Sequence, residues 1–203
     1  MSDTLRVTGH VKYVSNRTEE IEMSDGYLNK PLFKKIFVDH ICTDIQWNVQ
    51  SDRYLAAAQL LLNAVDIISG LTRPAHQEDT TRKEFIAWAD KFMSLKGNKY
   101  QLTGTDIYAA RCGFSHGYTP HPKLVREGKA KTLSYVDAST MPVMTDDGSL
   151  IIVSLKHLKE AFTEGLIATM KEINSSVELS TLVNPRLDAM FYTENLPEKF
   201  QNL

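Results

Sequence analysis

Cysteine is scarce in this sequence, and several other features that mark particular protein classes are missing. The two cysteines, Cys42 and Cys112, cannot form the framework of a disulfide-rich secreted protein. The formal net charge is only −2, so the chain as a whole does not attract nucleic acid, and an RNA contact needs a local basic patch. There is no run of eighteen apolar residues and no signal-like leader, internal repeat or low-complexity tract. These absences predict a soluble protein of the reducing cytoplasm that does not enter a membrane.

The residues that are present are typical of a globular protein with a helical core. The chain has 203 residues, of which 42% are hydrophobic and 24% charged, so it is long enough to bury a sizeable core. Apolar side chains recur at helical spacing in five segments, which predicts a mainly α fold. These segments are residues 31–45, 52–70, 82–95, 103–116 and 155–173.

Start signals precede these segments. Pro31 falls in the first turn of the first segment, where its missing N–H costs nothing, and Thr81 with Glu84 forms a capping-box sequence at the third. We expect side-chain caps at the other starts from Ser51, from Thr103 or Thr105, and from Ser154.

Two short strands interrupt the helical pattern. Thr132–Val136 and Leu150–Val153 have strand composition, and Asp147-Gly148 is a hairpin turn signal. We therefore expect a small antiparallel β-ribbon at about 132–153, inserted in a helical bundle.

One domain with appendages is the predicted organisation. The bundle covers residues 31–175, and residues 1–30 form an N-terminal arm or short strand. Residues 176–203 form a C-terminal arm, which Asn184-Pro185 and Leu196-Pro197 should limit to short helical turns.

Reactive side chains are concentrated at the end of the fourth helical segment. Arg111, Cys112, His116 and Tyr118 lie within eight residues, in a stretch broken by glycines. On an ideal helix Arg111 and Tyr118 are about 20° apart, whereas Arg111 and His116 are about 140° apart. One straight helix cannot aim all three at one point. Either the helix ends near Ser115, or a second copy of the segment faces the first.

This pattern of arginine, four residues, histidine, one residue and tyrosine resembles the signature of the HEPN superfamily, and in its form with tyrosine the HepT-type toxins. The resemblance implies a HEPN-like helical bundle with the motif on its fourth helix, as predicted here. It also implies a metal-independent ribonuclease, of toxin or defence type and without a cofactor, that acts as a homodimer whose two motifs meet in one cleft. An antitoxin or a nucleotidyltransferase is the partner that such a protein would have.

The residue types suit that chemistry. An imidazole exchanges protons near neutral pH, so His116 can take the proton of a ribose 2′-hydroxyl, while Arg111 can bind the phosphate with two N–H groups. Tyr118 can position the phosphate, and the product is a 2′,3′-cyclic phosphate. A basic run follows the motif and can supply the local positive field that RNA needs. Its members are Lys123, Arg126, Lys129 and Lys131.

Other interpretations of the same residues stay open. In a structural one, Arg111 pairs with Asp66 or Asp106, and His116 caps the helix C-terminus. Asp66 is then either an exposed edge residue or a buried acceptor that orients Arg111 or His116. In a second, the helical bundle is a non-catalytic module that binds a nucleotide or a protein.

A third interpretation uses Cys112 and His116 as a thiol–imidazole pair, or as metal ligands together with His121. A zinc site also needs a fourth ligand or a water, which the sequence does not single out.

Overall fold

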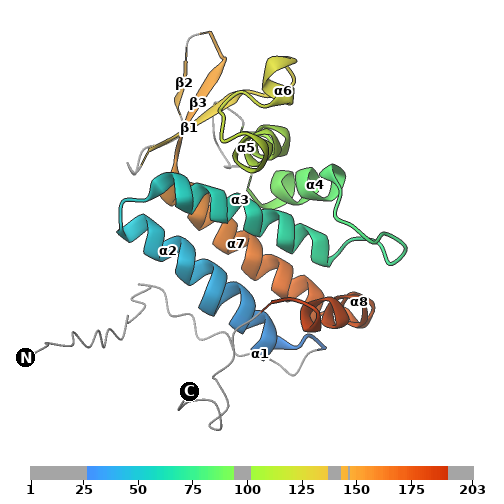
Figure 1. Cartoon of the computed structure of the whole chain (residues 1–203). Helices are drawn as coiled ribbons and strands as arrows, with labels where there is room; N and C mark the ends of the chain where they lie inside the picture. Colours follow the sequence, from blue (N-terminus) through green and yellow to red (C-terminus); the bar gives the residue numbers. More distant parts are fainter. Residues whose placement is uncertain (1–26, 94–101, 137–142, 146, 192–203) are drawn as a thin grey trace, which may run out of the picture.

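The computed structural model describes residues 27–93, 102–136, 143–145 and 147–191 of the chain. These residues are mainly helical, as the sequence predicts, and carry one small sheet (Figure 1). The predicted N-terminal strand lies outside the described residues. The elements are α1 Lys30–Phe33, a π-helical stretch η1 Lys34–Cys42, α2 Thr43–Gln50, α3 Tyr54–Leu71, α4 Arg82–Phe92, α5 Gly104–His116, α6 Lys123–Arg126, β1 Thr132–Val136, β2 Val143–Met144, β3 Leu150–Ser154, α7 Leu155–Asn174 and α8 Val177–Asp188.

Helix α3 is the centre of the bundle and contacts α2, α4, α5, α7 and α8. Its length and apolar composition alone would allow it to cross a membrane, but the core helix of a soluble protein can have the same length and composition. Ten of its residues are buried among the other helices, and Leu61, Leu62, Val65 and Ile68 are fully enclosed. We therefore describe α3 as the core helix of the bundle, the arrangement seen in Figure 1.

Helix α4 packs closely on α7. The indole Nε1 of Trp88 donates a hydrogen bond of 2.9 Å to Oγ1 of Thr169, inside the buried interface. Gly165 of α7 lies against Phe92, whose Cβ would be only 2.6 Å from a Cβ added at position 165. Because Gly165 has no side chain, α4 and α7 can approach closely. This packing fixes the position of α4 and, through α4, the position of the neighbouring α5.

Most of the predicted helix starts are present. Thr81 and Glu84 form the capping box of α4, and Thr103 forms a second one with Asp106 at α5. Ser154 caps α7 by accepting from the backbone N–H of His157. The predicted cap at Ser51 is wrong, because Ser51 ends α2 and α3 begins two residues after Asp52.

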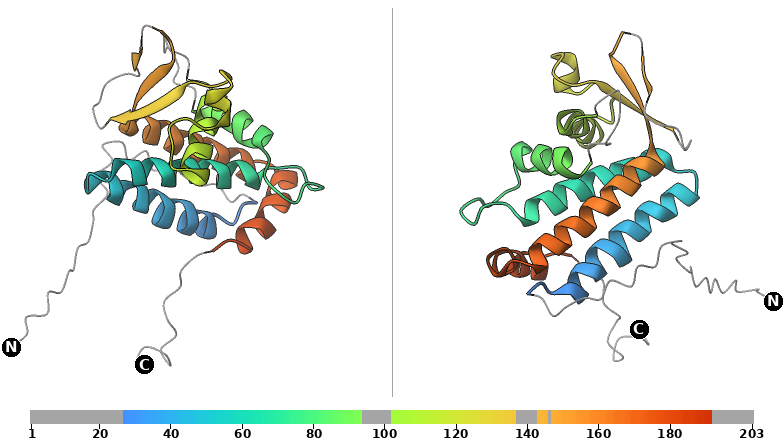
Figure 2. Two further views of the ribbon diagram at one scale, coloured as in Figure 1. Left: turned by 45° about the horizontal axis from the view of Figure 1, so that its top comes forward. Right: turned by 180° about the vertical axis from the view of Figure 1, so that it is seen from behind.

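The predicted antiparallel ribbon is wrong in its pairing. Strands β1 and β3 are parallel, with Leu133 opposite Ile151 and Tyr135 opposite Val153. The turn signal at Asp147-Gly148 is real, but it joins β3 to the two-residue strand β2, which is antiparallel to it. The order is therefore β1-β3-β2, and β3 leads directly into α7 (Figure 2).

The segment after residue 175 is more regular than the sequence suggests. Helix α8 continues through Pro185, and its Val183 and Leu187 join the core. Arg186 donates to the carbonyl oxygens of Leu71 and Arg73 and so satisfies the end of α3. The packing of Val183 and Leu187 offsets the loss of the backbone hydrogen bond that Pro185 cannot donate. Residues 192–203 lie outside the described part of the chain.

Candidate functional site at the end of α5

The chain folds back sharply after α5. The N–H of Thr119 donates to the carbonyl oxygen of Gly113 at 3.2 Å. A Cβ on Gly113 would lie 2.4 Å from the carbonyl oxygen of Thr119, so this return requires glycine. Tyr118 takes φ = 46°, a left-handed conformation that is uncommon for a residue with a side chain. As a result, Tyr118 leaves the helical path and does not lie above Arg111.

Arg111 is held by Asp66 of α3. The guanidinium Nη2 donates to Oδ2 of Asp66 at 2.6 Å, and both side chains are about three-quarters buried, with 24% and 27% exposed. The sequence left Asp66 and Asp106 open as partners of Arg111, and the structure has Asp66; this residue is a partly buried acceptor and not an exposed edge residue. The Nε atom of Arg111 is buried without a hydrogen-bond partner in the described structure. Asp66 therefore fixes the guanidinium against α3, while about a quarter of the Arg111 side chain stays accessible to an anion.

His116 is the last residue of α5 and is exposed. No hydrogen bond or ion pair to its imidazole occurs within the described residues. The helix continues to His116, which lies five positions after Arg111. On an ideal helix this spacing is a rotation of about 140° and a rise of about 7.5 Å along the axis. On this helix the two side chains therefore do not share a face, and the helix end at His116 does not turn the imidazole to the side of Arg111.

The outward face of α5 lies between these two residues. Tyr108 and Cys112 stand on it one turn apart, and Arg82 of α4 lies over the Tyr108 ring at 5.6 Å from its centre. Burial raises the pKa of the Tyr108 hydroxyl, as does contact with Cys112, while Arg111 and Arg82 lower it. Arg82 is therefore a second cation beside the motif. The sequence pattern missed it because it comes from another helix.

The thiol and metal interpretation gains no support. Cys112 contacts Tyr108 on its own helix. Among the described residues, no group of three or more histidine, cysteine or acidic side chains could hold a metal ion. His121 therefore does not complete a site with Cys112 and His116.

The basic run after the motif is only partly free. The ammonium group of Lys129 lies 2.8 Å from a carboxylate oxygen of Glu127, and that of Lys123 lies 3.7 Å from the other. The hydrogen bonds and charges of the two lysines lower the pKa of the Glu127 carboxyl, and the hydrogen bond from Lys129 has the largest effect. Arg126 donates to the carbonyl oxygen of His121. Lys131 differs, because its backbone N–H is bound by the buried Asp106 and its side chain lines a pocket. Of the four predicted cations, Lys131 alone adjoins that cavity.

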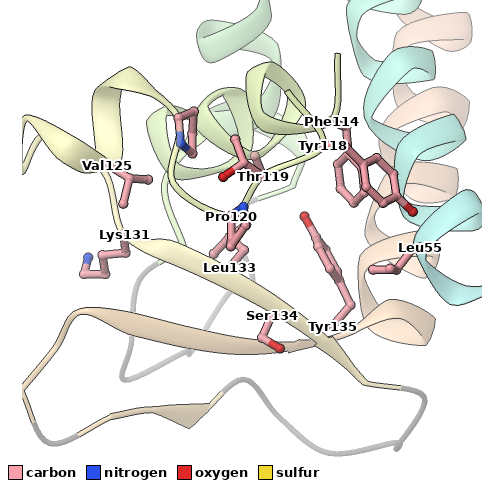
Figure 3. Close-up of a pocket in the computed structure, with 12 residues that line it drawn as sticks. Leu55, Phe114, Tyr118, Thr119, Pro120, Val125, Lys131, Leu133, Ser134 and Tyr135 are labelled. Atoms are coloured by element: carbon pink, nitrogen blue, oxygen red, sulfur yellow. The ribbon is translucent and has the colours of Figure 1, made fainter. Parts of the chain in front are cut away.

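A pocket of about 270 Å³ lies between the α5–α6 turn, strand β1 and the start of α3. Tyr118, the last residue of the motif, lines this pocket, and Figure 3 shows the aromatic rings that surround the pocket. Phe114 is central, with its ring 5.8 Å from that of Tyr118 and 5.8 Å from that of Tyr135. The sequence interpretation singled out neither Phe114 nor Tyr135, since their approach depends on where β1 docks.

When the chain is compared with known proteins, no family model, no curated protein and no solved structure matches it.

Proposed function

We propose that the protein is a HEPN-like, metal-independent endoribonuclease. The observation that carries the proposal is the placement of two complementary groups on either side of the outward face of α5. One is the exposed imidazole of His116, and the other is the guanidinium of Arg111, fixed by Asp66. The first suits proton transfer, and the second suits the charge that develops on a phosphate.

In the proposed reaction the ribose 2′-oxygen attacks the phosphorus and its proton passes to His116. The bond from phosphorus to the 5′-oxygen breaks, and that oxygen takes the proton back from His116 and leaves as a hydroxyl. The products are a 2′,3′-cyclic phosphate and a 5′-hydroxyl end. Arg111 stabilises the negative phosphoryl oxygens, and Arg82 adds positive charge beside it. Tyr118 donates a hydrogen bond to the phosphate.

The proposal requires a homodimer. Since Arg111 and His116 lie on opposite flanks of α5, the His116 of one subunit must meet the Arg111 of the other. Two α5 helices that pack with their outward faces together satisfy this requirement with two-fold symmetry. On this face Cys112 and Ser115 have small side chains, and Tyr108 with the Arg82 that lies over its ring would form part of the contact.

A non-catalytic nucleotide-binding module is the second candidate. The pocket beside Tyr118 favours it, because a cavity lined by three aromatic rings can bind a base without any reaction. Under this alternative, His116 is a solvent-exposed side chain with no chemical role.

The test is a cleavage assay on single-stranded RNA in EDTA, with end-group analysis of the products. We expect 2′,3′-cyclic phosphate ends, and a loss of about 10² to 10⁴ in rate for His116→Ala. Cys112→Ser is the control on the same helix and should keep wild-type activity. Activity that EDTA or Cys112→Ser abolishes would contradict the mechanism, and RNA binding without cleavage would favour the binding module.

A further inference from the structure

The pocket beside the motif contains a polar group that the protein leaves unused. The hydroxyl oxygen of Tyr135 is shielded from solvent and has no hydrogen-bond partner within the described structure. Burial raises the pKa of this hydroxyl, which therefore stays protonated and able to donate. Figure 3 shows the ring rising from β1 with its oxygen directed into the space between Pro120 and the rings of Phe114 and Tyr118.

An unsatisfied hydroxyl at such a position is costly to a folded protein. A buried donor without a partner loses its hydration and gains nothing, whereas a phenylalanine would fill the same space without the loss. The hydroxyl is therefore best explained by a ligand that supplies the missing partner.

The walls of the pocket define the kind of ligand. Aromatic rings and Pro120 and Pro122 give flat apolar surfaces, and the volume of about 270 Å³ is small for a ligand site. A single planar heterocycle suits it better than a flexible chain, because stacked rings fill such a space while their edges accept hydrogen bonds. Lys131 lines the same pocket beside Val125, on the side away from Tyr118, and no carboxylate pairs with its ammonium group in the described structure (Figure 3), so a negative charge attached to the ligand would be attracted there.

We propose that this pocket binds the base of a ribonucleotide, with Tyr135 donating to the base edge and Lys131 attracting the attached phosphate. The inference rests on the proposed ribonuclease function, since Tyr118 belongs to both the motif and the pocket. It extends that function by naming the part of the substrate that is read: one unstacked base beside the cleaved phosphate, which confines activity to single-stranded RNA.

The experiment is calorimetric titration of the full chain with the four nucleoside 3′-monophosphates. Inorganic phosphate, which lacks a base, and benzoate, which lacks base edges, are the comparison probes. We expect at least one nucleotide to bind at least tenfold more tightly than either. Tyr135→Phe keeps the ring and should weaken that binding about fivefold to tenfold, the effect of one hydrogen bond.

The same substitution should raise the Tm of the free protein by about 2–4 °C, because it removes the unsatisfied hydroxyl. Weaker binding together with a higher Tm excludes misfolding as the cause. Tyr27→Phe removes the hydroxyl of an exposed tyrosine beside α8, outside the pocket, and as the control it should change neither quantity.

Failure of the pocket and failure of the nuclease are distinguishable. If wild type cleaves RNA but no nucleotide binds better than phosphate, or Tyr135→Phe leaves binding unchanged, the pocket assignment is overturned and the nuclease stands. If nucleotides bind and Tyr135→Phe weakens them, while wild type cleaves no RNA, the base pocket stands and the nuclease does not. Benzoate binding as tight as that of the nucleotides also overturns the base assignment.

Discussion

Arg111 and Asp66 are joined by a 2.6 Å contact between Nη2 and Oδ2, across the interface of α5 with α3. Forty-five residues separate them in sequence, so the pair ties the motif helix to the central helix of the bundle. The carboxylate orients the guanidinium but also reduces its net charge. Removal of the Asp66 charge should therefore strengthen the binding of a phosphate but slow the reaction at that phosphate.

Asp66→Asn tests this relationship. The amide keeps the shape and one acceptor, but loses the charge, so we expect the free energy of unfolding to fall by about 1–3 kcal/mol. RNA should bind more tightly because Arg111 is no longer neutralised, while kcat falls because the guanidinium is less well oriented. Glu172→Gln breaks the exposed Lys91–Glu172 pair, also of 2.6 Å, and should alter neither value measurably. Equal effects from both variants would show that Asp66 has no special role.

Gly113→Ala should destabilise the protein although alanine favours helices. The new Cβ would lie 2.4 Å from the backbone carbonyl oxygen of Thr119, which cannot move without opening the return of the chain. We expect a loss of about 1–3 kcal/mol, against a helix-propensity gain of up to about 1 kcal/mol. Urea denaturation measures the difference.

Gly117→Ala is the matched control for that variant. Its nearest neighbour would be the methyl carbon Cγ2 of Thr119 at 3.2 Å, the end of a side chain that can turn away. We expect a smaller loss than at Gly113. A Gly113→Ala protein as stable as wild type would show that the turn adapts and that it does not hold Tyr118 in a fixed position.

The capping box of α4 predicts a dependence of stability on pH. Hydrogen bonds from the Thr81 hydroxyl, from Gln77 and from the Thr81 N–H lower the pKa of Glu84 from 4.5 to about 2. A lowered carboxyl pKa stabilises the fold above the unfolded value, and this contribution is lost as the pH falls from about 5 to 2. Glu84→Gln should remove about 1 kcal/mol near neutral pH and little at pH 2.

The measurement is the urea midpoint of wild type and Glu84→Gln between pH 6 and 2. The two curves should converge as the pH falls. Glu178→Gln removes an acidic residue from the first turn of α8, where no capping box exists, and serves as the control. A constant gap between wild type and Glu84→Gln across this range would show that the charge of Glu84 is not involved.

The helices were predictable because their signals are local. Thr81 and Ser154 are caps whose effect depends on the next few residues, and the structure has both. The Arg111–Asp66 pair was one of the alternatives that the sequence offered, since a carboxylate on so apolar a helix needs a partner. The cost of leaving a charge alone indicates that a partner exists, but it did not distinguish Asp66 from Asp106 as the partner of Arg111, nor a buried Asp66 from an exposed one.

Pairing in space was not predictable in the same way. The direction of β1 against β3 depends on the path of the chain between residues 136 and 150, which composition does not specify. Phe114 and Tyr135 meet only because β1 docks beside α5, and Arg82 reaches Tyr108 only because α4 packs on α5. Each of these contacts joins separate elements, and no local pattern encodes it. The pocket therefore required the structure.

A mixture of two inactive variants gives the sharpest test of the shared site. Arg111→Ala and His116→Ala should each be inactive alone, since each removes one of the two proposed groups. In a hybrid dimer, the intact His116 of one subunit meets the intact Arg111 of the other at one site, while the second site lacks both. Random exchange makes half the dimers hybrids, each with one complete site, so we expect about one quarter of the wild-type rate. Denaturing the two variants together and refolding them ensures exchange, and separately refolded samples mixed at the end are the control. A quarter of the activity in the co-refolded sample alone supports a site built from two chains. No recovery, in a sample that light scattering shows to be dimeric and exchanged, would mean that Arg111 and His116 do not meet across subunits, and the proposed mechanism would fail with it.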